Sequence, residues 1–244
     1  MRYRIWAVAC GALLLITGCG HRAQTASVPA PPIANPSGYP QTAESQPTVP
    51  NSEEGAEEVP AGRPIYSETG MASWYGPPYN KRRGANGEVY DENAISAAHR
   101  TLPMGSLIRV TNLQTGQSAM MRITDRGPFV PDRTIDLSVG AAKALGVWRP
   151  GTARVRIDVY ETPKPINEGG RWCVQIGAFS HEGAAKRLQE NLAREYASAS
   201  VIEFTGPTGH WVRIRPENGD RRLAVEIARS LRPKEGEAYL VRLD

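Results

Sequence analysis

The segment from Asn86 to Ser138 decides how this chain folds. It holds four short motifs built around charged or polar residues: N-G-E at 86–88, A-A-H-R-T-L-P-M-G at 97–105, T-D-R-G-P-F at 124–129 and I-D-L-S at 135–138. Glycines or prolines that favour turns stand close to Glu88, His99 and Asp125. Titratable groups on turns, with short apolar runs between them, indicate a cleft on a small β-domain.

Strand-like runs surround these motifs. They span residues 71–75, 106–112, 118–123 and 153–160. One helical pattern covers Val139 to Leu145; Asp136 or Ser138 is its candidate N-cap, and Gly146 ends it. Short strands separated by turn signals favour a small β-barrel over residues 70–162.

A second globular domain is predicted at 171–244, after a linker at 163–170. Its strands and helices follow the order βαββαβ, which favours one sheet with both helices on the same face. Ser180 and Asp220 are the expected N-caps of its two helices. The fold class is therefore mainly β in the first domain and α+β, of the ferredoxin or RNP type, in the second.

Alternation along the strands divides the side chains of this second sheet between two faces. Four apolar residues are expected to face the helices: Val174, Ile176, Val212 and Ile214. The other face is expected to be open, and it carries Cys173, Gln175, Trp211, Arg213 and Arg215. An aromatic ring beside amide and guanidinium donors suits sugar rings and their hydroxyls, although an exposed polar face that binds nothing stays open as the alternative.

The N-terminus has the features of a secretory signal peptide at 1–18, because Arg2 and Arg4 precede a short apolar run. Residues 15–19, L-I-T-G-C, resemble the lipobox of bacterial lipoproteins, in which the cysteine, here Cys19, is lipidated after cleavage. An ordinary signal peptide with an incidental cysteine is the alternative. Residues 19–69 are rich in Pro, Ser, Ala, Thr and Glu, which predicts a disordered tether.

Cysteine use and charge argue against a disulfide-stabilised fold, a metal site and a nucleic-acid-binding protein. If Cys10 leaves with the signal peptide and Cys19 carries lipid, Cys173 stands alone and no internal disulfide is expected. No Cys or His cluster has the spacing of metal ligands, and no cofactor is implied. Residues 171–244 carry 12 basic and 10 acidic side chains, a balance that, with the secretion signal, argues against nucleic acid as a partner.

Glu88 and Asp125 are the candidate acids for chemistry. Cleavage of a glycosidic bond needs an acid with a raised pKa that protonates the leaving oxygen. Apolar neighbours or a second carboxylate would raise that pKa, and His99 would contact the acid or the substrate. The residues alone leave other readings open: Asp125 as a turn residue, His99 as a structural histidine, and Asp136 as a helix cap.

Several segments together resemble the rare lipoprotein A family. They are G-M-A-S-W-Y-G (70–76), A-N-G-E (85–88), A-A-H-R-T-L-P-M-G (97–105), D-R-G-P-F (125–129) and I-D-L-S-V-G-A-A-K-A-L-G (135–146). The resemblance implies a double-psi β-barrel for the first domain. W-C-V-Q-I-G-A-F-S (172–180) resembles the first strand of a SPOR domain, which implies binding to peptidoglycan glycan strands that lack stem peptides.

Carried over position by position, the resemblance implies catalytic roles for Asp125, Glu88 and His99, with Asp91 and Asp136 at further acidic positions. The implied activity is that of an endolytic lytic transglycosylase, a carbon–oxygen lyase that cleaves MurNAc–GlcNAc bonds and leaves 1,6-anhydroMurNAc ends. Asp125 is expected to act first as acid and then as base. Two departures stand out: Gly84 replaces a common threonine, and Arg215 replaces a usual glycine.

Two other functions remain as alternatives. One is a binding module that grips glycan without cleaving it, as expansins do, and the other is a hydrolase that uses water. Gly20 after Cys19 resembles the pattern for outer-membrane sorting, so the expected location is the periplasmic face of the outer membrane of a Gram-negative bacterium, enriched at the division septum. The same resemblance implies a role in septal cell-wall processing and daughter-cell separation. Septal proteins are possible partners.

Overall fold

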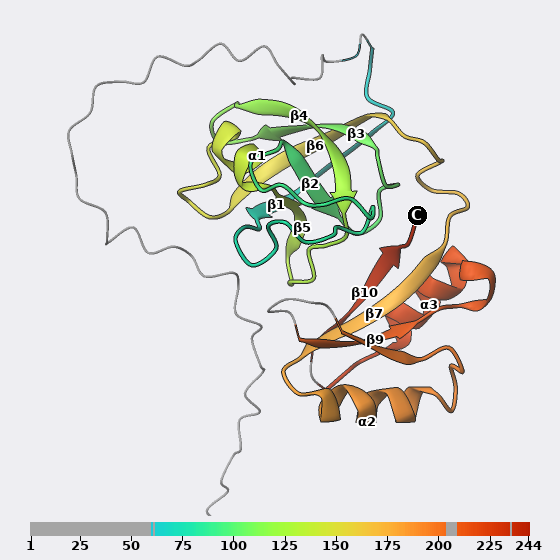
Figure 1. The fold of residues 1–244 in the computed structure, drawn as a ribbon. Coiled ribbons are helices and arrows are strands. Elements are labelled where there is room, and N and C mark those ends of the chain that lie inside the picture. The colour runs from blue at the N-terminus through green and yellow to red at the C-terminus, as the bar shows by residue number, and fades with distance from the viewer. Residues whose placement is uncertain (1–59, 61, 204–208, 235) are drawn as a thin grey trace, which may run out of the picture.

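The computed structural model describes residue 60 and residues 62–203, 209–234 and 236–244 (Figure 1). The expected signal peptide, Cys19 and most of the expected tether lie outside these residues. Within the described part of the chain, no helix has the length and apolar character needed to cross a bilayer.

Six strands form a closed barrel in the first domain. They are β1 (Tyr66–Trp74), β2 (Ser96–His99), β3 (Leu107–Asn112), β4 (Ser118–Asp125), β5 (Arg133–Leu137) and β6 (Ala153–Glu161). Their order around the barrel is β1-β5-β2-β4-β3-β6, and β1 closes onto β6. The pairs β1–β5 and β2–β4 are parallel and the others antiparallel. Alternate side chains, among them Val110, Ile123 and Ile157, fill the interior and are fully buried.

The prediction of a small barrel is confirmed, but the predicted barrel starts later in the chain and has fewer strands than the barrel in the structure. β2 and β5 were absent from the predicted strands, because β2 is only S-A-A-H and β5 carries the charged residues Arg133 and Asp136. The prediction that the tether extends to residue 69 is wrong. Tyr66–Thr69 lies in β1 and pairs with β6, so backbone hydrogen bonds order a segment that has few apolar side chains.

Helix α1 (Val139–Ala144) is capped by Ser138, which decides between the two candidate caps. The Ala141 N–H donates to Ser138 Oγ at 3.1 Å, and Gly146 ends the helix with φ of +67°. Ser138 is fully buried, and its hydroxyl also donates to the Ala94 carbonyl at 2.5 Å. One hydroxyl therefore holds both the helix and the chain that enters β2.

The second domain has the predicted βαββαβ order. Its elements are β7 (Trp172–Phe179), α2 (Glu182–Leu192), β8 (Ser200–Glu203), β9 (His210–Ile214), the 3₁₀ turn η1 (Glu217–Gly219), α3 (Arg221–Ser230) and β10 (Glu237–Arg242). The strands form an antiparallel sheet in the order β10-β7-β9-β8. Asp220 caps α3 as expected, accepting from the Leu223 N–H at 2.8 Å, but His181 rather than Ser180 is the N-cap residue of α2.

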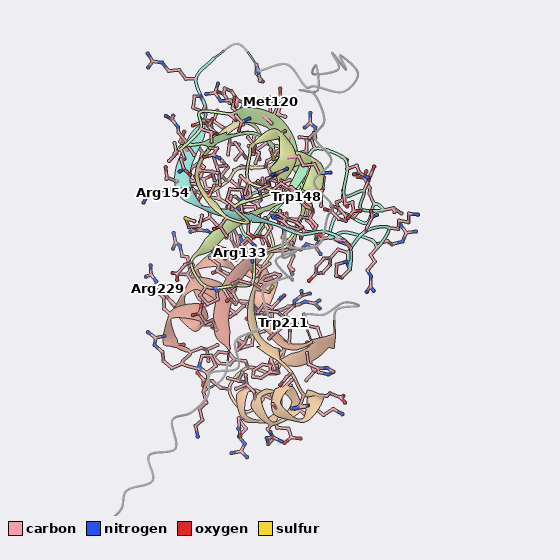
Figure 2. All side chains as sticks on the ribbon, turned by 90° about the vertical axis from the view of Figure 1, so that its left-hand side faces the viewer. Met120, Arg133, Trp148, Arg154, Trp211 and Arg229 are labelled. Atoms are coloured by element: carbon pink, nitrogen blue, oxygen red, sulfur yellow. The ribbon has the colours of Figure 1, made fainter. Side chains whose placement is uncertain are left out.

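The two faces of this sheet are divided as alternation predicts. Val174, Ile176, Val212 and Ile214 share one core with α2 and α3. The expectation that the other face is open is wrong, because the barrel packs on it. Cys173 and Gln175 are fully buried and Trp211 is 1% exposed, whereas Arg215, near the edge of this face, stays exposed. Figure 1 shows the barrel on the side of the sheet opposite α2, and Figure 2 places Trp211 near this junction.

We expect Ser138→Ala to lower the free energy of unfolding of the barrel by about 1–3 kcal/mol, because the cap is lost and buried backbone groups lose their partner. Ser180→Ala is the matched control, since Ser180 is exposed and makes no cap, and it should stay within about 0.5 kcal/mol of the parent protein. Urea unfolding followed by tryptophan fluorescence checks both values. Equal losses from the two substitutions would contradict the capping role of Ser138.

Candidate active site

Asp125 and Asp136 lie on either side of one small residue. In β2, Ala98 pairs with Asp125 of β4 on one side and with Asp136 of β5 on the other. Because residues in register on neighbouring strands point to the same face, both carboxyl groups project from the face that carries the Ala98 methyl group. Ala98 also packs with Tyr75 and Tyr90, which form an aromatic floor beside the two acids.

Asp125 is held through only one of its two carboxylate oxygens. Its Oδ1 accepts the Ala85 N–H at 2.9 Å and the Arg126 N–H at 2.8 Å. No described residue donates a hydrogen bond to Oδ2. Burial raises the pKa of Asp125, the two N–H groups and the Arg126 charge act against this rise, and the Asp136 charge adds to it. A raised pKa together with an unbonded oxygen is the combination that a general acid needs.

Glu88 lies across the same cavity from the end of β4. The cavity has a volume of about 130 Å³ and is lined by Gly84, Asn86, Glu88, Val89, Tyr90, Asp91, Ala94, Ser96, Thr124 and Asp125. Asn86 Nδ2 donates to Glu88 Oε2 at 2.7 Å, and the Glu88 N–H donates to Asn86 Oδ1 at 3.0 Å. Glu88 is exposed but oriented, so its carboxylate is available to a ligand in the cavity.

The loop that carries Glu88 is tied to the strand that carries Asp125. The Asn86 N–H donates to the Thr124 carbonyl at 3.2 Å, and Gly87 turns the chain with φ of +86°. A Cβ atom at Gly84 would lie 3.3 Å from the Thr124 carbonyl oxygen and 3.6 Å from Asp125 Oδ2. The glycine at this position thus leaves more room beside the unbonded oxygen than a threonine would.

His99 lies outside this cavity, and its contacts are structural. It is 4% exposed, and strand alternation directs it to the face of β2 opposite Ala98. Its Nδ1 accepts the Thr101 N–H at 3.2 Å and the Leu102 N–H at 3.0 Å. Since Nδ1 is an acceptor, Nε2 carries the hydrogen, and it lies 3.0 Å from Glu68 Oε1. Glu68 was not among the predicted site residues, because its segment reads as tether.

The two further acids occupy different environments. Asp91 lines the cavity and accepts the Asn93 N–H at 2.9 Å, which orders the local turn. Asp136 does not line the cavity, and it forms a buried ion pair with Arg133, whose Nε donates at 3.0 Å. Burial raises the pKa of Asp136 and the Arg133 charge opposes that rise. The structure therefore brings Asp125, Glu88 and Asp91 together, with Asp136 behind them and His99 apart.

Tyr75 is a residue of the site that sequence reasoning did not single out. Its ring stacks on Tyr90 with centroids 4.5 Å apart, and the Tyr90 hydroxyl donates to the Tyr75 carbonyl at 2.9 Å. The Tyr75 hydroxyl is buried and makes no hydrogen bond to the described residues. Burial, and then the charge of Asp125, raise the pKa of Tyr75, so this group is a neutral phenol. The sequence feature that could have identified Tyr75 as a site residue is its position in the motif G-M-A-S-W-Y-G.

Asp125→Asn should stabilise the fold at pH 7 and lose that advantage in acid. The pKa of Asp125 is raised in the native state, so wild-type stability falls as pH rises from the unfolded-state pKa of about 3.8 through the native value. The amide keeps the Oδ1 acceptor and carries no charge, so the free energy of unfolding of the variant does not fall over this pH range. Urea midpoints between pH 3 and pH 8 measure the difference, and an advantage that grows toward low pH would contradict the raised pKa.

His99→Leu should destabilise the barrel more than His99→Asn. Leucine leaves two buried N–H groups and Glu68 without their partner, at a cost of about 2–3 kcal/mol, whereas an asparagine oxygen replaces the Nδ1 acceptor. Thermal or urea unfolding gives the comparison. If both variants kept wild-type stability while losing activity, His99 would instead act in the chemistry.

Comparison with known proteins follows the two-domain division. The family model described as lytic transglycolase, a double-psi β-barrel model, matches residues 67–157, and the SPOR domain model matches residues 168–242. The second match covers the sheet formed by β7–β10 and its two helices. The barrel and sheet thus correspond to the double-psi β-barrel and SPOR domain predicted from the motifs.

The curated relatives of similar sequence are named as peptidoglycan transglycosylases. The chain is 39% identical over 162 residues to the endolytic peptidoglycan transglycosylase RlpA of Vibrio cholerae, covering 64% of this chain and 61% of the relative. It is 36% identical to the protein of that name from Campylobacter jejuni, covering 57% and 60%. For the probable RlpA of Synechocystis sp., identity is 54% over 92 residues, covering 38% and 29%. The chain thus spans about three-fifths or less of these relatives.

Solved structures were also matched, at low scores. The Streptomyces papain inhibitor matches with a TM-score of 0.34 and 20% identity, covering 40% of this chain and 97% of that one. A Clavibacter michiganensis expansin in complex with cellohexaose matches with a TM-score of 0.34 and 17% identity, covering 48% and 59%. The family models match the barrel and the sheet in the order seen here, and the relatives of similar sequence are named RlpA. The chain therefore combines a region similar to the lytic transglycolase double-psi β-barrel with a region similar to the SPOR domain.

Proposed function

We propose that this chain is an endolytic lytic transglycosylase that cleaves the glycan strands of peptidoglycan. The observation that carries the proposal is the state of Asp125: two backbone N–H groups hold Oδ1, no described residue donates to Oδ2, and burial raises the pKa. The names of the curated relatives support the same reaction. We assign Asp125 as the acid and then the base, with Glu88 and Asp91 binding and orienting the sugar.

The reaction needs one proton to be delivered and then recovered. Protonated Asp125 donates through Oδ2 to the oxygen between N-acetylmuramic acid and N-acetylglucosamine, and the bond from C1 to that oxygen breaks. The C6 hydroxyl of the muramic acid attacks C1, and its proton passes to the Asp125 carboxylate. No water is consumed, the acid returns to its starting state, and the product carries a 1,6-anhydro ring.

The surroundings of Asp125 favour both steps. In the protonated state, burial stabilises the neutral carboxyl group, and in the ionised state the two N–H groups stabilise the carboxylate. Glu88 lies in the same cavity with an oriented carboxylate that suits the positive charge developing at C1. His99 contributes through position, because the turn that it holds supplies two carbonyls that bind the Arg126 guanidinium, next to Asp125.

The rest of the chain would deliver this domain to its substrate. Residues 1–18 act as a signal peptide in this proposal, Cys19 carries the lipid anchor, and the tether runs from there to the start of the barrel. The barrel extends to residue 162, residues 163–170 link it to the SPOR domain at 171–244, and that domain binds glycan lacking stem peptides through Gln175, Trp211, Arg213 and Arg215. The location would be the periplasmic face of the outer membrane, at the division septum, in daughter-cell separation.

We expect a protein of residues 60–244 to release 1,6-anhydromuramyl sugars from peptidoglycan whose stem peptides an amidase has removed. Asp125→Asn should reduce the rate at least about 100-fold, because the proton donor is lost, and Glu88→Gln about 10-fold or more. Asp132→Asn is the matched control, since Asp132 is exposed, has φ of +61°, and lies outside the cavity. Mass spectrometry of the released sugars gives the rates.

The products also decide between the proposed function and its alternatives. Reducing-end sugars without anhydro ends would replace the transglycosylase with a hydrolase. Absence of products, combined with firm pelleting on the same glycan, would make the chain a wall-binding protein that does not cleave. Equal rates for Asp125→Asn and Asp132→Asn would remove Asp125 from the reaction.

A further inference from the structure

One face of the C-terminal sheet is buried although neither of the helices α2 and α3 lies on it. This sheet face consists of Cys173, Gln175, Trp211, Arg213 and Tyr239, on the side away from α2 and α3. Cys173 and Gln175 are fully buried and Tyr239 is 7% exposed. On the helix side an apolar core accounts for the burial, whereas on this face Phe129 of the barrel packs against the cluster that contains Cys173, Trp211 and Tyr239.

The barrel covers the sheet face with the segment that follows Asp125. The Phe129 ring lies 5.2 Å from Trp211 and 5.8 Å from Tyr239, centroid to centroid. The guanidinium of Arg100, in the turn after β2, lies 5.5 Å from the centre of the Tyr239 ring. Phe129 therefore occupies the aromatic surface where a sugar ring would stack.

Hydrogen bonds fasten the two domains at the end of β10. Arg126 Nη2 donates to the Asp244 carbonyl at 2.8 Å, and the Met104 N–H donates to the same oxygen at 3.2 Å. The Arg242 N–H donates to the Arg100 carbonyl at 2.9 Å, which extends the β10 backbone onto the barrel. These contacts hold Phe129 over the sheet face.

The docked arrangement leaves polar atoms without partners. Gln175 Nε2 and Arg126 Nε are buried and donate to no acceptor among the described residues, although Gln175 Oε1 accepts from Arg213 at 2.9 Å. Unpaired buried donors oppose docking. The hydroxyl and acetamido oxygens of a glycan strand would accept hydrogen bonds from the Gln175 amide, and its sugar rings would stack on Trp211. Glycan would therefore supply the acceptor that Gln175 Nε2 lacks in the docked arrangement.

We propose that the barrel and the glycan strand compete for the sheet face, so that the SPOR domain binds glycan only after Phe129 has left it. The inference rests on the proposed glycan binding by the SPOR domain. Since Phe129 lies four residues after Asp125 and Arg126 bonds to both domains, the same separation frees the segment beside the catalytic acid. Glycan binding on the sheet and release of the segment that follows Asp125 would then be one event.

Phe129→Ala in residues 60–244 tests the competition with two separate readouts. The first is the rate at which a maleimide labels Cys173, the one cysteine in that span, which lies on the covered face and whose pKa burial raises to about 11. The second is the affinity for amidase-treated glycan, measured by pelleting. Loss of the aromatic contacts should raise both values about tenfold.

Two further variants make the result specific. Phe129→Leu keeps an apolar side chain at this position and should restore most of the slow labelling and weak binding. Leu113→Ala removes an exposed apolar side chain elsewhere on the barrel and should change neither value. Circular dichroism shows whether each variant keeps both folded domains.

The outcomes separate this inference from the function on which it rests. Faster labelling together with tighter glycan binding supports the competition. Faster labelling with unchanged glycan binding overturns the competition alone. Faster labelling with no pelleting by any variant overturns the competition together with the proposed glycan binding. Unchanged labelling and unchanged binding would show that Phe129 does not close the face.

Discussion

The position of the short strand β2 between β4 and β5 is the constraint on which the rest of this structure depends. It pairs parallel with β4 and antiparallel with β5, and this places Ala98 between Asp125 and Asp136. Four residues thus close the barrel and set the spacing of two acids. Because a shift of one residue in β2 would exchange its faces, Ala98 would turn away from the acids and His99 toward them. The site is precise because the barrel around it is closed.

The two aspartates beside Ala98, Asp125 and Asp136, differ in the groups that their carboxylates contact. Asp136 forms a buried ion pair with Arg133, so its carboxylate is engaged by a cation and would be costly to leave unpaired. Asp125 is held by backbone N–H groups on one oxygen, and within the described part of the chain its other oxygen accepts no hydrogen bond. The difference lies in what each carboxylate contacts.

Arg126 connects this site to the second domain. Its backbone N–H supports Asp125, and its side chain reaches the carbonyls of the His99–Leu102 turn and of Asp244. Burial and the nearby Arg242 charge lower the pKa of Arg126 to about 10, yet it remains a cation at neutral pH. The turn after β2 therefore contacts Asp125 only indirectly, through Arg126. His99, on the opposite face of β2, is linked to Asp125 through this turn and Arg126.

The sequence by itself determined the domain order, the βαββαβ pattern, the cap at Asp220 and the grouping of Glu88 with Asp125, because these depend on local periodicity and on motifs carried by turns. It did not predict β2, β5 or the first residues of β1, whose order comes from hydrogen bonds to distant strands rather than from apolar pattern. The orientation of His99, the pairing of Asp136 with Arg133, and the burial of Trp211 and Gln175 were decided only by tertiary structure. Each depends on which face of a strand meets which neighbour, and for the SPOR sheet that neighbour is another domain whose docking surface leaves no periodic signal along the chain.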